Sequence, residues 1–264
     1  MPVHSDSTPA PAVVQTGFRW RQLASIPVFD HWAGRVWPWL AGLAIVLAAT
    51  GLYVGFFVAP TDHQQGEVYR IIFLHVPAAW MSMFIYVAAA IHAGLGLIYR
   101  TRISPLLARA LAPTGAMFTV IALWTGAAWG KPTWGAWWVW DARLTSELIL
   151  LFLYLGYIGV SSAIEDTTRA DNAGAIVLLA GVVNVPIIYF SVQWWSTLHQ
   201  GATIRLDAAP SMAHTMLLGM LLIAVSSVCS LLLPTIMSDI LNRGVYLSDW
   251  DYILRCSAKM LVVT

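Results

Sequence analysis

Long apolar stretches alternate with short polar segments along most of this chain. A helix rises 1.5 Å per residue, so about 20 apolar residues are needed to cross a bilayer. Six stretches come close to that length or exceed it, at about residues 37–58, 71–99, 111–128, 144–164, 173–192 and 212–233. The pattern therefore predicts an all-α integral membrane protein with six transmembrane helices. Gly51 and Gly55 in the first stretch have the small-xxx-small spacing of close helix contacts, although chance gives the same spacing.

The two ends of the chain lack such stretches. Residues 1–36 are polar and carry proline and arginine, which predicts an N-terminal arm that ends in a short interfacial segment. Residues 234–264 are mixed in character and predict a C-terminal tail. We therefore expect an arm (1–36), a six-helix domain (37–233) and a tail (234–264). No cleavable signal peptide is expected, because the first apolar stretch starts late and follows this polar lead.

The distribution of basic residues predicts the orientation in the membrane. With six spans, both termini lie on one side, together with the loops 100–109 and 165–172. This side holds ten Lys and Arg: Arg19, Arg21, Arg35, Arg100, Arg102, Arg109, Arg169, Arg243, Arg255 and Lys259. The other side holds four: Arg70, Lys131, Arg143 and Arg205. The positive-inside rule then places both termini in the cytoplasm of a bacterial inner membrane, and the loops 61–70, 129–143 and 193–211 in the periplasm.

The composition agrees with a membrane protein and disfavours several kinds of binding site. Apolar residues make up 59% of the chain and charged residues 10%, outside the usual range of soluble domains. The net charge of +1 without a basic tract gives no reason to expect nucleic-acid binding. Cys229 and Cys256 form no CxxC or CxxCH motif, which disfavours a zinc ribbon, a thiol redox pair and covalently attached haem. No Walker motif is present, so any ATP use must come from partner subunits.

Residues 129–143 (WGKPTWGAWWVWDAR) form a segment unlike the rest, which we name the tryptophan segment. Five of the fourteen tryptophans fall in twelve of its residues: Trp129, Trp134, Trp137, Trp138 and Trp140. Tryptophan is common at membrane interfaces, and this explains scattered residues such as Trp37, Trp39, Trp194 and Trp195. Five so close together, interleaved with Gly and Pro, exceed an interfacial belt. They predict a short, non-spanning aromatic platform between the third and fourth spans, which binds a flat ligand.

Haem suits this platform chemically. Indole faces stack on a flat apolar porphyrin, imidazole nitrogens ligate its iron, and Arg or Lys pairs with its propionates. His75 and His199 are the simplest ligand pair on the outer side, with His63 and His214 in reserve. His92 lies seventeen residues beyond His75, about 25 Å along a helix, and cannot share the site. For any single histidine, a structural hydrogen-bonding role is an equally good interpretation.

The charged residues of the tryptophan segment have two interpretations each. Asp141 precedes the fourth span, where an aspartate ordinarily caps a helix, and direct contact with bound haem is its second interpretation. Arg143 and Glu147 are spaced i,i+4 and can form an ion pair. Arg143 and Lys131 are equally plausible partners for haem propionates.

Three motifs in this order resemble the CcmC family of haem-transfer proteins. They are IIFLHVPAAW at 71–80, the tryptophan-rich WWD-like run at 129–157 and VNVPIIYFSVQWWSTLHQG at 183–201. The similarity covers about residues 37–233, and a tail as long as 234–264 departs from the family pattern.

The resemblance implies a specific role. The family has six transmembrane helices and a periplasmic WWD segment, which corresponds to Trp129 through Asp141 here. Its axial histidines correspond to His75 and His199. The resemblance further implies that haem b is presented to the haem chaperone CcmE, that CcmA, CcmB and CcmD are partners, and that the protein is a transfer subunit and not an enzyme.

Three other functions remain open on the sequence. A membrane haem lyase or cytochrome c synthase would attach haem to apocytochrome directly, but such relatives are larger. A b-type electron-transfer subunit would need paired histidines inside the spans, and His92 has no partner at its depth. A solute channel would need polar residues along several spans, and the first and third spans have almost none.

Overall fold

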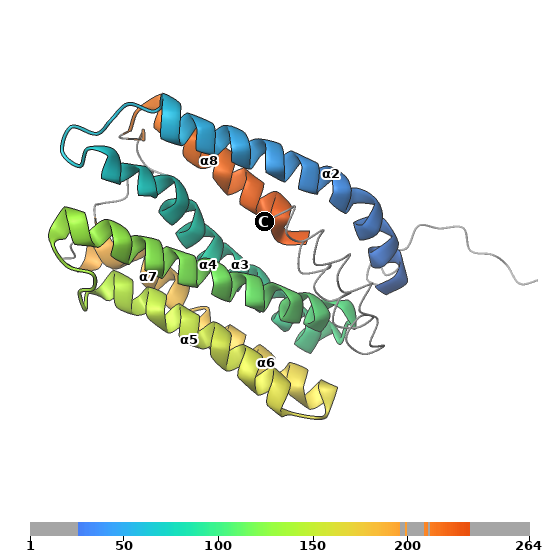
Figure 1. The fold of residues 1–264 in the computed structure, drawn as a ribbon. Coiled ribbons are helices and arrows are strands. Elements are labelled where there is room, and N and C mark those ends of the chain that lie inside the picture. The colour runs from blue at the N-terminus through green and yellow to red at the C-terminus, as the bar shows by residue number, and fades with distance from the viewer. Residues whose placement is uncertain (1–25, 196–198, 200–208, 211, 233–264) are drawn as a thin grey trace, which may run out of the picture.

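The structure is a computed structural model that describes residues 26–195, 199, 209–210 and 212–232. The N-terminal residues before 26 and the tail from 233 onward, on which two of the predicted regions fall, lie outside the described residues. Within the described part, helices account for the regular structure and no β-strand is formed. The elements are α2 (Ile26–Tyr53), η1 (Val54–Val58), η2 (Glu67–Ile71), α3 (Ile72–Tyr99), α4 (Ile103–Trp134), α5 (Ala142–Ala163), α6 (Thr167–Gly181), α7 (Asn184–Trp194), α8 (His214–Cys229) and η3 (Ser230–Leu232), arranged as in Figure 1.

Five segments of the described chain are long and apolar enough to cross a membrane: His31–Val58, Glu67–Tyr99, Ile103–Trp134, Ala142–Ala163 and Thr167–Trp194. The predicted all-α membrane class is therefore confirmed. The sixth predicted stretch contains α8, a shorter apolar helix, so the number of six spans stays a prediction.

The predicted boundaries of the spans agree well with those of helices α3 and α5 and less well with those of α2 and α4. α2 begins at Ile26, eleven residues before the predicted first span, so the expected interfacial segment is part of a continuous helix. α4 runs from Ile103 through Trp134, so the predicted third span of 111–128 was too short at both ends and the first part of the tryptophan segment is helical. Pro132 is tolerated because it lies in the last turn. The helix ends at Gly135, which adopts φ 80° and donates its N–H to Lys131 O at 3.0 Å.

The predicted fifth span, 173–192, is divided into two helices. α6 starts earlier, at Thr167, because the side chain of Asp166 caps its first turn and accepts from Arg169 N at 2.7 Å. α6 ends at Gly181, and Pro186 in the first turn of α7 lacks the N–H that an uninterrupted helix would use. Asn184 at the start of α7 donates instead to Ser146 O on α5 at 2.8 Å.

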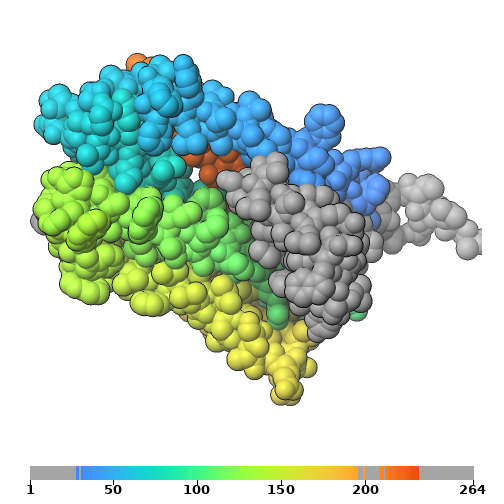
Figure 2. All heavy atoms as spheres, in the orientation of Figure 1, coloured from blue at the N-terminus to red at the C-terminus, as the bar shows by residue number. Residues whose placement is uncertain are grey.

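α3 occupies the middle of the bundle. It packs against α4, α6 and α8, while α2 pairs with α8 and α5 packs against α4, α6 and α7. In the space-filling view, α8 is seen between α2 and the group of α3 and α4 (Figure 2). A Cβ atom on Gly51 would lie 2.7 Å from Ile223 on α8, so the predicted close helix contact at this glycine is confirmed.

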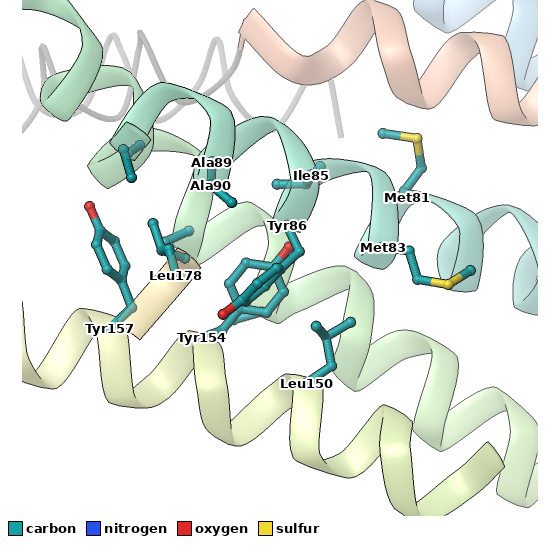
Figure 3. Close-up of a cluster of buried hydrophobic side chains, with 14 of the residues drawn as sticks. Met81, Met83, Ile85, Tyr86, Ala89, Ala90, Leu150, Tyr154, Tyr157 and Leu178 are labelled. Atoms are coloured by element: carbon teal, nitrogen blue, oxygen red, sulfur yellow. The ribbon is translucent and has the colours of Figure 1, made fainter. Parts of the chain in front are cut away.

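The main core joins α3 to α4, α5 and α6 around two buried tyrosines (Figure 3). The rings of Tyr86 and Tyr154 meet edge to face with centroids 5.0 Å apart. Tyr154 also donates to the carbonyl of Ser82 at 2.7 Å. The rings fit because Gly115 and Gly181 offer no side chain where they pass, and a Cβ on either would overlap a tyrosine. This core fixes α3, and α3 carries His75.

Candidate functional site

His75 lies in the first turn of α3 and faces α4. Its Nδ1 is 3.0 Å from the carbonyl oxygen of Ala122 and 3.1 Å from Oγ1 of Thr125. The ring lies so close to Gly126 that a Cβ there would be 2.9 Å from the imidazole Cε1. A carbonyl only accepts, so Nδ1 carries the proton in the contact with Ala122. The opposite nitrogen, Nε2, then keeps its lone pair for a ligand.

His199 comes from the connection between α7 and α8 and lies beside His75. The centroids of the two imidazoles are 6.3 Å apart, with the ring planes inclined by 38°. Nδ1 of His199 is 3.8 Å from Oδ2 of Asp141, and both atoms are buried without a hydrogen-bond partner in the described structure. The structure therefore brings together the two histidines predicted as a pair. The other outer histidines, His63 and His214, are exposed and do not line the same pocket.

Two of the five tryptophans complete a ring of aromatic contacts with these histidines. Trp129 meets His75 edge to face at 5.8 Å between centroids. Trp129 lies 6.3 Å from Trp134, which lies 6.1 Å from His199. Trp129 is buried, and its Nε1 donates to Oε1 of Gln65 at 2.7 Å. The order His75, Trp129, Trp134, His199 thus forms one continuous wall.

The other three tryptophans form the rim. Trp137 and Trp140 are 61% and 75% exposed, and Trp138 packs against Trp140 at 5.3 Å between centroids. They belong to the short loop between α4 and α5, close to a small cavity also lined by His199 and Asp141. The predicted platform therefore has two parts, a helical inner wall and an exposed loop.

Asp141 caps α5, as predicted. Its Oδ1 accepts from the backbone N–H of Leu144 at 2.8 Å. Burial raises the pKa of Asp141, but the neighbouring His199 and the backbone N–H of Leu144 outweigh burial and hold this pKa below its ordinary value. The carboxylate is thus charged at neutral pH and can orient the His199 ring.

Arg143 and Glu147 do not form the predicted i,i+4 ion pair. No contact within 4.0 Å joins their charged atoms, and Glu147 accepts instead from Ser82 Oγ on α3 at 2.8 Å. The reason is tertiary: α3 offers a hydroxyl on the buried face of α5. Both residues line a cavity of about 30 Å³ together with His75 and His199. Among the described residues, Arg143 is the only Lys or Arg that lines this cavity.

Lys131 points elsewhere. It is exposed, donates to Gly135 O at 3.1 Å and does not line the cavity of the histidine pair. Sequence reasoning missed three residues that hold this site: Gln65, Thr125 and Gly126. Each acts through a contact between helices or with a loop, and no local pattern marks it.

The donor set fits a haem iron. Two imidazoles line one cavity; Nδ1 of His75 contacts two oxygens of α4, and Nδ1 of His199 lies 3.8 Å from the Asp141 carboxylate. Such oxygen partners are the usual support of metal-ligating histidines. The ring centroids are 6.3 Å apart, so both imidazoles could ligate one haem iron, for which histidine is a usual axial ligand. Groups of three or more acidic, Cys or His side chains for a bare metal ion do not occur in the described residues.

Comparison with known proteins gives a consistent result. The family model "Heme exporter protein C" matches residues 19–246, beyond both ends of the predicted similarity. The "Heme exporter protein C" of Escherichia coli K12 is 54% identical over 182 residues, 69% of this chain and 74% of that protein. The protein of that name from Bradyrhizobium diazoefficiens is 45% identical over 227 residues, 84% and 86% of the two chains. A "putative cytochrome c biosynthesis ccmC-like mitochondrial protein" of Marchantia polymorpha is 48% identical over 165 residues, 62% and 70% of the two chains.

Proposed function

Since this chain belongs to the heme exporter protein C family, we propose that it binds haem at the tryptophan segment and passes it on during cytochrome c maturation. The chain is a multi-pass protein of the inner membrane. The observation that carries the proposal is the juxtaposition of His75 and His199, 6.3 Å apart between ring centroids, inside a wall of tryptophans.

The proposed topology has six crossings, with both termini in the cytoplasm and the tryptophan segment in the periplasm. α8 has sixteen residues, about 24 Å at 1.5 Å per residue, and η3 adds about 6 Å. The sum is close to the thickness of the hydrocarbon layer, about 30 Å. The ten-to-four distribution of Lys and Arg supports the orientation.

In the proposed site, His75 and His199 ligate the iron of haem b through Nε2. Ala122 and Thr125 hold the ring of His75, and Asp141 orients the ring of His199. Trp129 and Trp134 stack beside the macrocycle and keep water away from the iron. Arg143 is the proposed partner of a propionate, since it lines the same cavity. Lys131, in its contact with Gly135, is placed for a role at the rim only.

We propose that haem is released at the exposed part of the tryptophan segment. Trp137 and Trp140 lie open at the end of the bundle, where an acceptor can approach the edge of bound haem. We assign this surface to the haem chaperone CcmE, with CcmA, CcmB and CcmD as the other subunits of the assembly. The chain itself acts as a binding and transfer subunit, and covalent attachment occurs on the acceptor.

The experiment is a haem titration of the detergent-purified protein, followed by absorption. His75→Ala and His199→Ala are each expected to abolish or shift a bis-histidine spectrum. His63→Ala and His214→Ala are the matched controls, because both are exposed histidines near the same end of the bundle. Wild-type spectra in the first two variants, with unchanged melting temperatures, would disprove the ligand assignment. Co-purification with an apocytochrome instead of CcmE would favour a haem lyase.

A further inference from the structure

The end of the bundle opposite the tryptophan segment contains a large cavity that the haem site does not use. Its volume is about 750 Å³. It lies where α3 ends, α4 begins and the α5–α6 connection turns, at the far right of the bundle in Figure 1. The polar and charged residues that shape it include Arg100, Arg102, Arg109, Tyr157, Thr167 and Asp171.

The cavity carries an excess of positive charge. Arg109 pairs with Asp171 through Nε at 2.7 Å, but its Nη2 is buried without a hydrogen-bond partner in the described structure. Arg100 and Arg102 are exposed and make no ion pair within the described residues. Three guanidinium groups thus face one carboxylate, and a buried N–H without a partner calls for an acceptor. An anion with several oxygens satisfies both requirements.

The start of α4 adds donors on the same side. Its N-cap residue, Arg102, makes no side-chain cap, and the side chain of Thr101 donates to Ser104 Oγ at 2.7 Å. The first backbone N–H groups of a helix have no partner within the helix and attract anions. The N-terminus of α4 therefore adds to the attraction of an anion by the three arginines, and the arginines define the site.

Part of the lining is apolar. Ala93 and Leu97 of α3, Leu106 and Ala108 of α4 and Ala175 of α6 line the cavity beside the arginines. Outside it, Ile98 and Tyr99 are 73% and 68% exposed, as expected of side chains in contact with lipid. A ligand that suits the whole cavity has an anionic head and an apolar body, and the membrane supplies such a molecule.

We propose that this cavity binds the headgroup of an anionic phospholipid, with the phosphate between Arg100, Arg102 and Arg109 and an acyl chain along Leu97 and Leu106. Basic pockets between transmembrane helices are known to accept anionic lipid headgroups. This inference does not rest on haem binding, and its test uses the protein without haem.

The test measures the thermal unfolding of the full-length, detergent-purified protein with three probes. They are dioleoyl phosphatidylglycerol, dioleoyl phosphatidylcholine and inorganic phosphate. A ligand that binds only the folded state raises the melting temperature in a concentration-dependent manner. We expect a saturable rise with phosphatidylglycerol alone.

The variants separate the cavity from general surface charge. Arg100→Gln with Arg102→Gln leaves the Arg109–Asp171 pair in place and is expected to weaken phosphatidylglycerol binding about fivefold per arginine, on the order of 25-fold together. Arg169→Gln is the control, because Arg169 is exposed at the same end and does not line the cavity. Equal weakening by both substitutions, no weakening by the double variant, or an equal effect of inorganic phosphate on the wild type would each overturn the proposal. Native mass spectrometry of the untreated protein provides a second measurement, since it should show retained anionic phospholipid that the double variant loses.

Discussion

Replacing Gly126 by alanine tests whether the position of His75 matters to haem binding. The Cβ atom of the new residue would lie 2.9 Å from Cε1 of His75, whereas ordinary contacts begin at 3.4 Å. The imidazole must therefore withdraw from α4 by about 0.5 Å. Both hydrogen-bond partners of its Nδ1, Ala122 and Thr125, belong to α4 and lie at 3.0 and 3.1 Å. Withdrawal stretches both bonds toward the limit of hydrogen bonding.

The size of the effect follows from the loss of these partners. Loss of an outer partner of a metal-ligating histidine typically weakens metal binding about 10–100-fold, so we expect the Kd of haem to rise by about that factor. Stability should respond in the opposite direction, since alanine is about 0.8–1.0 kcal/mol more favourable than glycine inside a helix. Part of this gain offsets the crowding at His75. A folded protein with weakened haem binding is the expected result.

The assay is a haem titration by absorption, with thermal unfolding measured on the same samples. Gly156→Ala is the matched control, because it makes the same substitution on α5 with no atom within 4 Å of the new Cβ. We expect Gly156→Ala to bind haem like the wild type. If Gly126→Ala also kept wild-type affinity and spectrum, His75 would not be an iron ligand in the orientation described here.

Three further predictions concern the core, the topology and Asp141. Gly115→Ala forces a methyl group into the ring of Tyr154 and is expected to lower the free energy of unfolding by about 1–3 kcal/mol, measured by thermal or denaturant unfolding in detergent. In a background without native cysteines, Gln64→Cys should react with an impermeant thiol reagent added outside spheroplasts, and Glu165→Cys should react only after lysis; the reverse pattern would contradict the proposed orientation. Because the pKa of Asp141 is lowered in the folded protein, its contribution is complete above the unfolded value of about 3.9 and is lost as pH falls through the folded pKa. Protonation of Asp141 should therefore not alter the haem affinity of the wild type between pH 5 and 7, measured by haem titration at each pH, whereas Asp141→Asn should weaken haem binding by the same factor across that range.

The positions of the five long apolar helices were largely predictable, because apolar stretches of this length leave few alternatives in a membrane. What the apolar pattern did not reveal is where helices continue past the membrane or break within it. α4 continues to Trp134 although Lys131 and Pro132 lower its hydropathy, because a proline in the last turn costs only a bond near the helix end. The break between α6 and α7 depends on Pro186, which lacks an N–H, and on the side chain of Asn184, which donates to the carbonyl of Ser146 on α5. The second contact joins two helices and cannot be predicted from local sequence.

The candidate site was predictable in its residue types and only partly in its contacts. Depth along the chain placed His75 and His199 at one end of the bundle but placed His63 and His214 there too, and only the packing shows that His75 and His199 lie side by side. The spacing of Arg143 and Glu147 suggested an ion pair, but the carboxylate of Glu147 accepts a hydrogen bond from Ser82 on α3 instead. Local spacing states which groups can meet, and packing between helices decides which of them do.

The two histidines are held by different kinds of structure, and this difference bears on transfer. His75 is placed by a helix that the tyrosine core fixes, and its ring is confined by the backbone of α4. His199 belongs to the connection between α7 and α8, and its described partners are the side chains of Asp141 and Trp134 and the ring of His75. A protein that must bind haem and then give it up benefits from this asymmetry. In the proposed haem site, His75, held by helix packing, would set the position of the iron, while His199, whose described contacts are with side chains, would separate from it without disturbing the bundle. Asp141 and Trp134, the partners of His199, line a small cavity together with the exposed Trp137, so the acceptor of the proposed transfer would approach haem on the side of His199.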